Sequence, residues 1–400
     1  MKEWKEVELN EVALLSRDSV KPEHIKTNEL YLGLESLEAT GACNPIKTTL
    51  GALKSNKYTF SENHILYGKL RPYLRKIVQP EFKGICSTDI IPILPLKDKI
   101  DTRYLYHYLR SDNMVQFATS RCSGANLPRI SPKQINKFKI PLPPLPIQKK
   151  IAAILDAADD YRKKTKALLD KYDELTQSIF LDMFGDPVRN EKGLKKGTIR
   201  DIVTEVKYGT SSKAIENGSY PYLRMNNIDY KGYMNYEKLK YIDVSEKDKP
   251  KYIVKKGDVL FNRTNSKELV GKTGIITHNK EMIIAGYLIR IRLKDEHNPY
   301  FLWSHLNSRW GKLTLMNMCK NIVGMANINA QELQNIPILL PPTNLQNAFA
   351  TKIESIALNK IELTKQIDKS EQLFQSLLQR AFMGELVLSL IHISEPTRPY

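Results

Sequence analysis

The chain contains two long stretches in which apolar positions recur at the spacing of a coiled-coil helix. They cover residues 147–184 and 345–383, and neither contains Gly or Pro. The steps between less polar positions alternate between four and three residues, which places those positions on one helical face. Pro146 suits a first helical turn, and Gly185 and Gly384 follow the two stretches as helix-ending residues. We therefore expect two helices, each roughly 57 Å long.

The predicted faces of the two helices should pack against each other. The first face runs through Ile147, Ile151, Ile154, Ala158, Tyr161, Thr165, Leu168, Tyr172, Leu175 and Ile179, and the second through Phe349, Ile353, Ile356, Lys360, Leu363, Ile367, Ser370, Phe374, Leu377 and Ala381. We expect Ile154 and Leu168 to be buried against the second helix, near residues 356–374. Helix-pairing candidates are Ile154, Leu168, Leu175, Ile356, Leu363 and Phe374. Apolar residues off these faces suggest docking of partner helices: Leu155, Leu169, Phe180, Leu358, Ile361 and Leu378.

The two helices belong to an internal repeat with a constant shift of 198 residues. Gln148 corresponds to Gln346, and the proline pair at 143–144 corresponds to the pair at 341–342. Ser131 with Gln134 predicts a capping box before the first helix, and Asn329 with Glu332 stands at the same place before the second. Two unrelated amphipathic helices would not share these upstream features. The chain is therefore a tandem duplication.

The repeat divides the chain into five predicted segments. They are a globular unit (1–146), a helix (147–186), a second globular unit (187–343), a second helix (344–385) and a tail (386–400). The stretch IHISEPTRPY in the tail fits neither repeat and resembles a translated sequencing-adapter artefact, so we assign it no function; a natural disordered tail is the alternative.

The two globular units share a framework but differ in one polar stretch. LRPYLRK follows ILYGK in the first unit, and RTNSKELVGK follows VLFN in the second. Arg can contact guanine through two hydrogen bonds, Asn can contact adenine, and Lys mostly contacts phosphate. Any one of these side chains can also be a solvated surface charge. The candidate DNA contacts are Lys69, Arg71, Arg75 and Lys76, and in the second unit Arg224, Asn226, Asn227, Arg263, Asn265, Ser266, Lys267 and Lys272.

Composition favours a polyanionic partner, although a solvated basic surface would give the same charge. The formal net charge is +17 over 400 residues, which is typical of proteins that bind nucleic acid. The four cysteines lie far apart without a CxxC pair, which argues against a zinc site or a disulfide framework and fits a reducing cytoplasm. No apolar run approaches 18 residues, so we expect no membrane span.

Catalytic motifs are not recognisable in the sequence. GKT at 271–273 has Ser266 where a phosphate-binding loop needs its first Gly. HNPYF at 297–301 only weakly matches an amino-methyltransferase motif and follows no Gly-rich cofactor loop. The seven His are scattered without metal-ligand spacing. We expect a non-catalytic chain with no metal and no cofactor of its own.

The order of these segments resembles the specificity subunit of type I restriction–modification systems. The resemblance rests on IPLPPLPIQKKI and NIPILLPPTNLQ before the helices, and on ILYGKLRPYLRK and GDVLFNRTNSKELVGKTG in the two units. It implies an α+β fold: two tandem α/β target-recognition domains, separated by two long helices that pair as an antiparallel coiled coil with pseudo-two-fold symmetry.

The same resemblance implies a function. Each domain would read one half of a bipartite site in double-stranded DNA, while the helices set the spacer and dock two methyltransferase subunits. Nuclease–translocase subunits would be added for cleavage. S-adenosylmethionine, ATP and Mg are implied only for those partners. Two alternatives are a DNA methyltransferase or single-chain restriction–methylation enzyme, and a scaffold that does not bind DNA.

Overall fold

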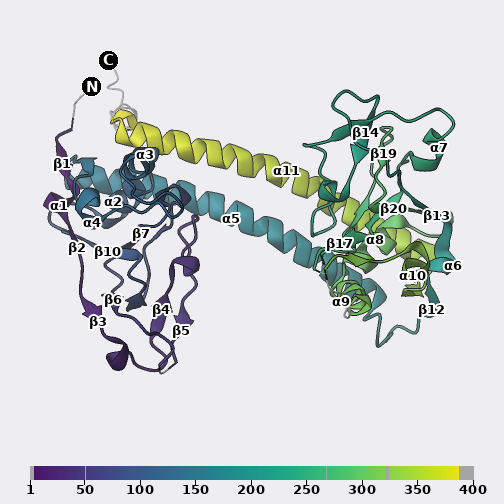
Figure 1. Cartoon of the computed structure of the whole chain (residues 1–400), viewed down its shortest axis with the longest axis horizontal. Helices are drawn as coiled ribbons and strands as arrows, with labels where there is room; N and C mark the ends of the chain where they lie inside the picture. The colour runs from purple at the N-terminus through teal and green to yellow at the C-terminus, as the bar shows by residue number, and fades with distance from the viewer. Residues whose placement is uncertain (1–3, 50, 267, 320–323, 387–400) are drawn as a thin grey trace, which may run out of the picture. The chain divides into compact units, whose positions relative to one another are not determined.

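The computed structural model describes all residues except 1–3, 50, 267, 320–323 and 387–400. Lys267 and nearly all of the predicted tail therefore lie outside the described residues. The chain forms two compact units. Unit 1 contains residues 1–166 and 365–400, and unit 2 contains residues 167–364. Each unit is thus a globular part together with one section of each long helix (Figure 1).

The two predicted long helices are confirmed. Helix α5 covers Leu145–Phe184 and helix α11 covers Thr343–Phe382, each 40 residues long. None of the helices among the described residues is long and apolar enough to cross a membrane.

The described residues of unit 1 form three sheets and four short α-helices besides the sections of the long helices. The sheets are β1(Glu6–Glu8)–β11(Lys139–Pro141), β2(Ala13–Leu15)–β10(Ile90–Pro95)–β7(Ile65–Gly68)–β8(Ile77–Val78), and β3(Ser19–Val20)–β6(Lys57–Phe60)–β9(Gly84–Cys86)–β4(Leu30–Leu32)–β5(Ile46–Lys47). The helices are α1(Leu9–Val12), α2(Thr102–Leu109), α3(Asp112–Ser120) and α4(Pro132–Ile135), with 3-10 turns η1(Pro22–His24), η2(Leu34–Ser36) and η3(Pro72–Leu74).

Unit 2 repeats the first two sheets strand for strand. These are β12(Lys195–Thr198)–β22(Pro337–Leu340) and β13(Val203–Tyr208)–β20(Leu288–Leu293)–β16(Val259–Asn262)–β18(Thr273–Ile275). Two further sheets are β15(Lys240–Ile242)–β14(Tyr220–Leu223)–β19(Ile283–Ile284) and β17(Thr264–Asn265)–β21(Ala326–Asn327). The helices are α6(Ile199–Ile202), α7(Lys249–Tyr252), α8(Pro299–Asn307), α9(Arg309–Met318) and α10(Ala330–Gln334), with the 3-10 turn η4(Met225–Asn227).

Each long helix is joined to its globular unit by a buried glutamine, and the two glutamines stand at equivalent positions of the repeat. Gln148 accepts a hydrogen bond from the Asp101 N–H (2.8 Å) and donates one to the Pro143 carbonyl (2.7 Å). Gln346 makes the equivalent bonds with Asn298 and Pro341, at 2.8 and 2.7 Å. Both side chains are fully buried. Because a buried amide must be satisfied on both its N and O sides, this pattern fixes the start of each helix.

A capping box is predicted at the start of both short helices before the long ones, and it forms at α10 but not at α4. The side chain of Asn329 accepts backbone N–H bonds at the start of α10, and the Asn329 N–H donates to the Glu332 carboxylate, which completes the capping box. At the start of α4 the Ser131 hydroxyl accepts a bond from the Gln134 N–H at 3.3 Å, but no bond from the Ser131 N–H to the Gln134 side chain occurs among the described residues. The first site is therefore a simple N-cap.

Within each unit the two helix sections run antiparallel and share the hydrophobic core. In unit 1, Phe374 and Leu378 of α11 pack in one cluster with Ile151 and Leu155 of α5. In unit 2, the Phe349 ring lies 5.1 Å from that of Phe184 and 5.9 Å from that of Phe180. Higher numbers on one helix thus meet lower numbers on the other in each unit. This is the predicted antiparallel pairing.

The predicted face of α11 is correct, but that of α5 is wrong in its middle. Ile356, Leu363 and Phe374 are buried, at 5–7% exposure, whereas Leu168 and Leu175 are each 43% exposed. Ile154 is half-buried. The expected burial is therefore wrong for Leu168 and only partly met by Ile154.

Polar contacts explain the difference. Residues one position further along α5 face inward: Arg162 donates to Glu371 at 2.8 Å, and Asp173 pairs with Lys360. The two helices contact each other here through ion pairs. A prediction based on apolar residues alone therefore chose the wrong face of α5 in its middle.

The off-face apolar residues also divide differently from the prediction. Leu155, Phe180 and Leu378 are at most 4% exposed and belong to the cores of their own units, so they are not available to partner helices. The reason is that the globular parts, in addition to the second helix, cover α5 and α11. Leu358 and Ile361 remain 68% and 56% exposed, and Leu169 is half-buried.

Candidate nucleic-acid interface

The divergent loop of unit 1 is a strained turn that follows β7. Arg71 and Arg75 flank η3 and both adopt the left-handed conformation, with φ of 51° and 50°. A left-handed conformation is costly for a residue other than Gly and persists only where neighbouring contacts hold it. The Arg71 N–H donates to the Pro128 carbonyl at 2.7 Å, and the Arg75 side chain pairs with Asp112. The loop is therefore held from both sides.

Three of the four basic residues predicted in this loop are used within the fold. Lys69 lies 3.8 Å from Asp89 and is largely buried, and burial lowers the pKa of its ammonium group. Arg75 pairs with Asp112, and Lys76 donates to the Leu34 carbonyl at 2.8 Å. Their assignment as DNA contacts is a poor one, because these bonds occupy the groups that would meet DNA.

Arg71 is the candidate that the fold leaves available. Its side chain is exposed, and no hydrogen bond or ion pair of that side chain occurs among the described residues. Tyr73 and Leu74, next to it in η3, are 49% and 40% exposed. The loop thus presents one unpaired guanidinium beside an aromatic and an aliphatic side chain, a set that can contact base edges and thymine methyl groups.

The divergent loop of unit 2 begins at Arg263, directly after β16. The Arg263 N–H donates to the Tyr287 carbonyl at 3.0 Å, and its own carbonyl accepts from the Ile328 N–H at 2.9 Å. Its guanidinium carbon lies 4.6 Å from the centre of the Tyr208 ring. The guanidinium Nη1 also reaches the Gly286 carbonyl, at 3.5 Å. Backbone and side chain are thus both positioned by neighbouring strands.

Two of the predicted contacts in unit 2 are structural. Asn227 is 3% exposed; its amide oxygen accepts from the Arg224 N–H at 2.9 Å, and its amide nitrogen donates to the Asn235 carbonyl at 3.0 Å. Lys272 is 8% exposed and donates to the carbonyls of Met225 (2.7 Å) and Ile228 (2.5 Å). Burial lowers the pKa of Lys272. Burial and these hydrogen bonds argue against a direct DNA contact by either residue, because their polar groups hold turn η4 and the residues that flank it.

The remaining candidates lie at or near the surface around Arg263. Asn226 is exposed, and Arg224, Asn265 and Ser266 are half-buried. The Asn265 amide nitrogen lies 3.8 Å from the Met225 sulfur, and its oxygen accepts the Ser266 N–H at 2.9 Å. The exposed aromatic side chains nearby, Tyr208 (41%) and Tyr287 (52%), were not predicted from the sequence.

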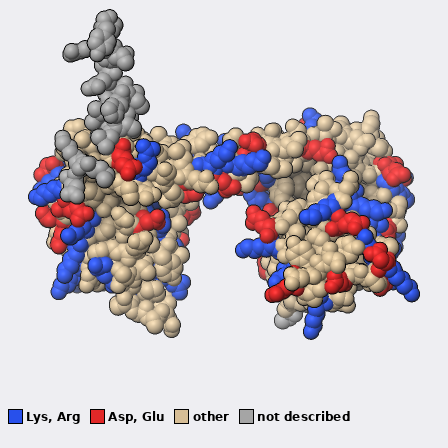
Figure 2. Space-filling view, turned by 90° about the horizontal axis from the view of Figure 1, so that it is seen from above, with Lys and Arg blue, Asp and Glu red and all other residues tan. Residues whose placement is uncertain are grey.

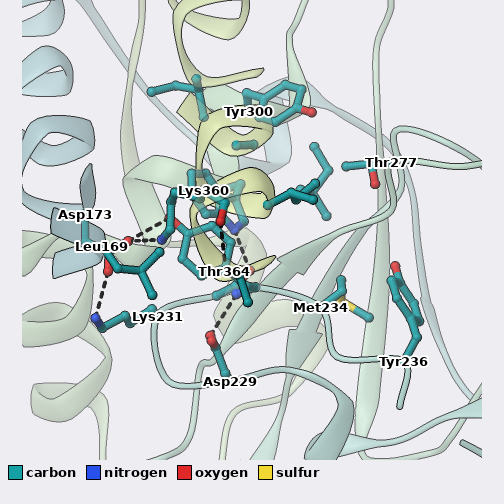
Figure 3. Close-up of a pocket in the computed structure, with 17 residues that line it drawn as sticks. Leu169, Asp173, Asp229, Lys231, Met234, Tyr236, Thr277, Tyr300, Lys360 and Thr364 are labelled. Carbon is teal, nitrogen blue, oxygen red and sulfur yellow. Dashed lines mark hydrogen bonds and ion pairs between the residues drawn. The ribbon is translucent and has the colours of Figure 1, made fainter. Parts of the chain in front are cut away.

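A second polar site joins the globular part of unit 2 to the helices. Asp173 of α5 binds Lys231 at 2.7 Å, pairs with Lys360 of α11, and accepts a hydrogen bond from the Tyr233 hydroxyl at 2.9 Å (Figure 3). Burial alone would raise the pKa of Asp173, but the hydrogen bonds from the two ammonium groups hold that pKa below its usual value. This cluster stabilises the position of the unit on its helices.

The cluster borders a pocket of about 690 Å³. Figure 3 shows Asp173, Lys231 and Lys360 on one side of it and Met234, Tyr236 and Tyr300 around the rest. Unit 1 has an ion pair at the positions that the shift of 198 residues relates to Lys360 and Asp173, where Arg162 of α5 binds Glu371 of α11 at 2.8 Å. The two units therefore share the position of the junction and differ in the residues that form it.

Surface charge is distributed over both units. On the face drawn in Figure 2, Lys and Arg side chains alternate with Asp and Glu. The net charge of +17 is therefore not gathered into one patch on that face. Among the residues that the structure describes, no group of three or more His, Cys, Asp or Glu could hold a metal ion.

Two copies of one α+β frame, each leading into a long helix and each carrying its own exposed polar loop, define a tandem recognition protein. The chain belongs to the type I restriction modification DNA specificity domain family, whose model matches residues 1–171 and 191–371.

Known relatives agree with this assignment. The specificity subunit of the type I restriction enzyme EcoKI from Escherichia coli (strain K12) is 27% identical over 303 residues, which cover 71% of this chain and 65% of that subunit. A chain from a structure of a type I R-M system, concerned with complex assembly and conformational transition, matches with a TM-score of 0.60 at 20% identity, covering 96% of this chain and 99% of that one. The type I S subunit from M. genitalium matches with a TM-score of 0.56 at 14% identity, covering 95% and 96%. The predicted family and fold class are thereby confirmed.

Proposed function

We propose that this chain is the DNA sequence-specificity subunit of a type I restriction–modification complex, in which each unit reads one half of a bipartite site. The observation that carries the proposal is the duplicated frame with divergent exposed loops. β7 and β16 occupy the same place in their sheets, yet Arg71 follows one and Arg263 the other. Two equivalent frames with different loop chemistry suit two half-sites of different sequence.

The loops would distinguish bases in the major groove. Arg71 in unit 1 and Arg263 in unit 2 are the groups best placed to form two hydrogen bonds with guanine O6 and N7. Asn226 adds an exposed amide in unit 2, a group suited to adenine. Lysines on the surface of each unit would contribute phosphate contacts, which add affinity without sequence preference.

The long helices would set the distance between half-sites and dock two methyltransferase subunits. Leu358 and Ile361 of α11 are exposed apolar residues on one stretch of helix, and Ile361 lines the pocket beside Asp173. Such residues favour contact with an apolar helix of a partner. Cleavage would need nuclease–translocase subunits in addition.

The chain itself would act without catalysis. S-adenosylmethionine, ATP and Mg would bind the partner subunits. The free cysteines suit a reducing cytoplasm, where we place the complex.

Exchange of one unit tests this proposal. Residues 187–343 are replaced by the equivalent part of another specificity subunit, and the hybrid is produced with its methyltransferase subunits in a host whose methylated motifs are then sequenced. One half-site should change and the other should stay. The matched control replaces residues 1–146 and should give the reverse result. A change in both half-sites, or in neither, would refute the two-reader function.

Binding of S-adenosylmethionine by the isolated chain would instead favour a methyltransferase, and a complex that methylates without this chain would favour a scaffold.

A further inference from the structure

Arg263 differs from the other arginines of its sheet in having no anionic partner among the described residues. Arg290 and Arg292 of the adjacent strand β20 both pair with Glu205, at 3.1 and 2.9 Å, and Arg292 also binds Asp258 at 2.8 Å. The guanidinium groups of Arg290 and Arg292 are therefore occupied by ion pairs within the unit. The Arg263 side chain has only its weak contact with the Gly286 carbonyl and its stacking on Tyr208. Its Nε is buried without a hydrogen-bond partner in the described part of the chain.

The Tyr208 ring is itself fixed. Tyr208 is the last residue of β13, where it pairs with Ile289 of β20. Its hydroxyl accepts a hydrogen bond from the Ala330 N–H at 2.8 Å, at the first turn of α10. Strand and helix therefore hold the ring at its two ends. A guanidinium stacked on a fixed ring is restricted to the plane of that stack, so its hydrogen-bonding edge has a set direction.

We propose that Tyr208 is a positioning residue, which holds the Arg263 guanidinium so that its edge reads a guanine in the second half-site. The inference rests on the proposed function and adds to it a base identity and the side chain that orients its reader. A stacked arginine loses less rotational freedom on binding, so it forms its two bonds to guanine O6 and N7 more readily than a free one. Arg71 in unit 1 has no cation–π contact among the described residues, so this device belongs to unit 2.

Two variants separate stacking from the hydrogen bond to α10. Tyr208→Phe keeps the ring and loses the hydroxyl, whereas Tyr208→Leu loses the ring and keeps a shorter, apolar side chain. The full chain is purified with its methyltransferase subunits, and binding is measured to duplexes carrying each single base change in the second half-site. Tyr208→Leu should lower discrimination on the order of 10-fold at one G·C pair, the pair that Arg263→Ala also relaxes. Tyr208→Phe should keep most of the wild-type discrimination, because strand β13 still holds the ring.

A chemical substitution in the DNA tests the same contact on the unaltered protein. Replacing the guanine with 7-deazaguanine removes the N7 acceptor while keeping the Watson–Crick pair. Wild type and Tyr208→Phe should lose about 10-fold in affinity for this duplex, and Arg263→Ala should lose none.

Three results would overturn the inference. The first is that Tyr208→Leu weakens binding to all duplexes equally. The second is that Tyr208→Phe and Tyr208→Leu lose the same amount of discrimination. The third is that the affinity of the wild type does not change when 7-deazaguanine replaces any guanine of the half-site. The proposed function fails separately, if the wild-type complex prefers no bipartite motif at all.

Discussion

Replacement by alanine should lower the stability of the protein strongly at Leu155 of α5 and only slightly at Leu168. Leu155 is fully buried and packs with Ile151, Phe374 and Leu378, whereas Leu168 is 43% exposed. Truncating a buried leucine to alanine removes apolar contacts and leaves a cavity, at a typical cost of about 2–5 kcal/mol. At Leu168 water already reaches the side chain, and alanine is a better helix former, so the cost should stay below about 1 kcal/mol.

These free energies convert into readily measured temperatures. For a unit of this size, 1 kcal/mol shifts the melting temperature by roughly 2–4 °C. Leu155→Ala should therefore lower the transition of unit 1 by at least about 4 °C, and Leu168→Ala should shift the transition of unit 2 by less than that. Leu363→Ala is the matched positive control, because Leu363 lies in unit 2 and is 6% exposed.

Differential scanning calorimetry of the full free chain gives these values, with circular dichroism to check that helix content is kept. The reasoning about the helix face would be refuted if Leu168→Ala cost as much as Leu363→Ala. It would be equally refuted by a Leu155→Ala variant that melts like the wild type.

Further predictions concern the loop, the buried histidine and the docking face. Arg71→Ala should relax the first half-site at one base pair by about 1–3 kcal/mol, whereas Lys76→Ala should lower stability and leave the methylated motif unchanged; motif sequencing distinguishes them. Burial lowers the pKa of His305 to about 4, so above pH 6.5 folded and unfolded states are both neutral, and as pH falls the unfolded state gains the proton first. Unit 2 should be about 2 kcal/mol less stable at pH 5 than at pH 7, and urea unfolding of His305→Gln should show a smaller difference; an unchanged difference would assign the effect elsewhere. Ile361→Asp should reduce co-purification of the methyltransferase subunits, and Asn359→Asp, at an exposed neighbouring position, should not; equal loss in both would remove the docking face.

The sequence predicted the architecture well because the architecture depends on periodicity. A repeat of four and three residues identifies a helix, and a constant shift from Gln148 to Gln346 identifies a duplication. The inward stripe of α5 could not be predicted in the same way. Its central contacts are ionic, and which of Tyr161 or Arg162 faces inward depends on where Glu371 of α11 lies.

The candidate site was predicted as segments and only partly as residues. Lys76 and Lys272 have the chemistry of DNA contacts, but each binds a backbone carbonyl that is 42 or 44 positions away in the sequence and that only the fold brings near. Tyr208 lies 55 positions before Arg263 in the sequence, and nothing in its local pattern marks it. Pairing of β13 with β20, and of β20 with β16, brings the two together.

The glutamine joint bears on how such a protein can evolve. Gln148 and Gln346 make matching bonds at matching distances, to prolines of their own segment and to the start of α2 or α8. The groups that form hydrogen bonds with each glutamine belong to the same repeat as that glutamine. The joint therefore does not depend on which repeat comes first. Genetic recombination between two such chains at the proline-rich segment would yield an intact joint on either side of the crossover. A new pairing of half-sites could then arise in one event, without a period of poor folding in between.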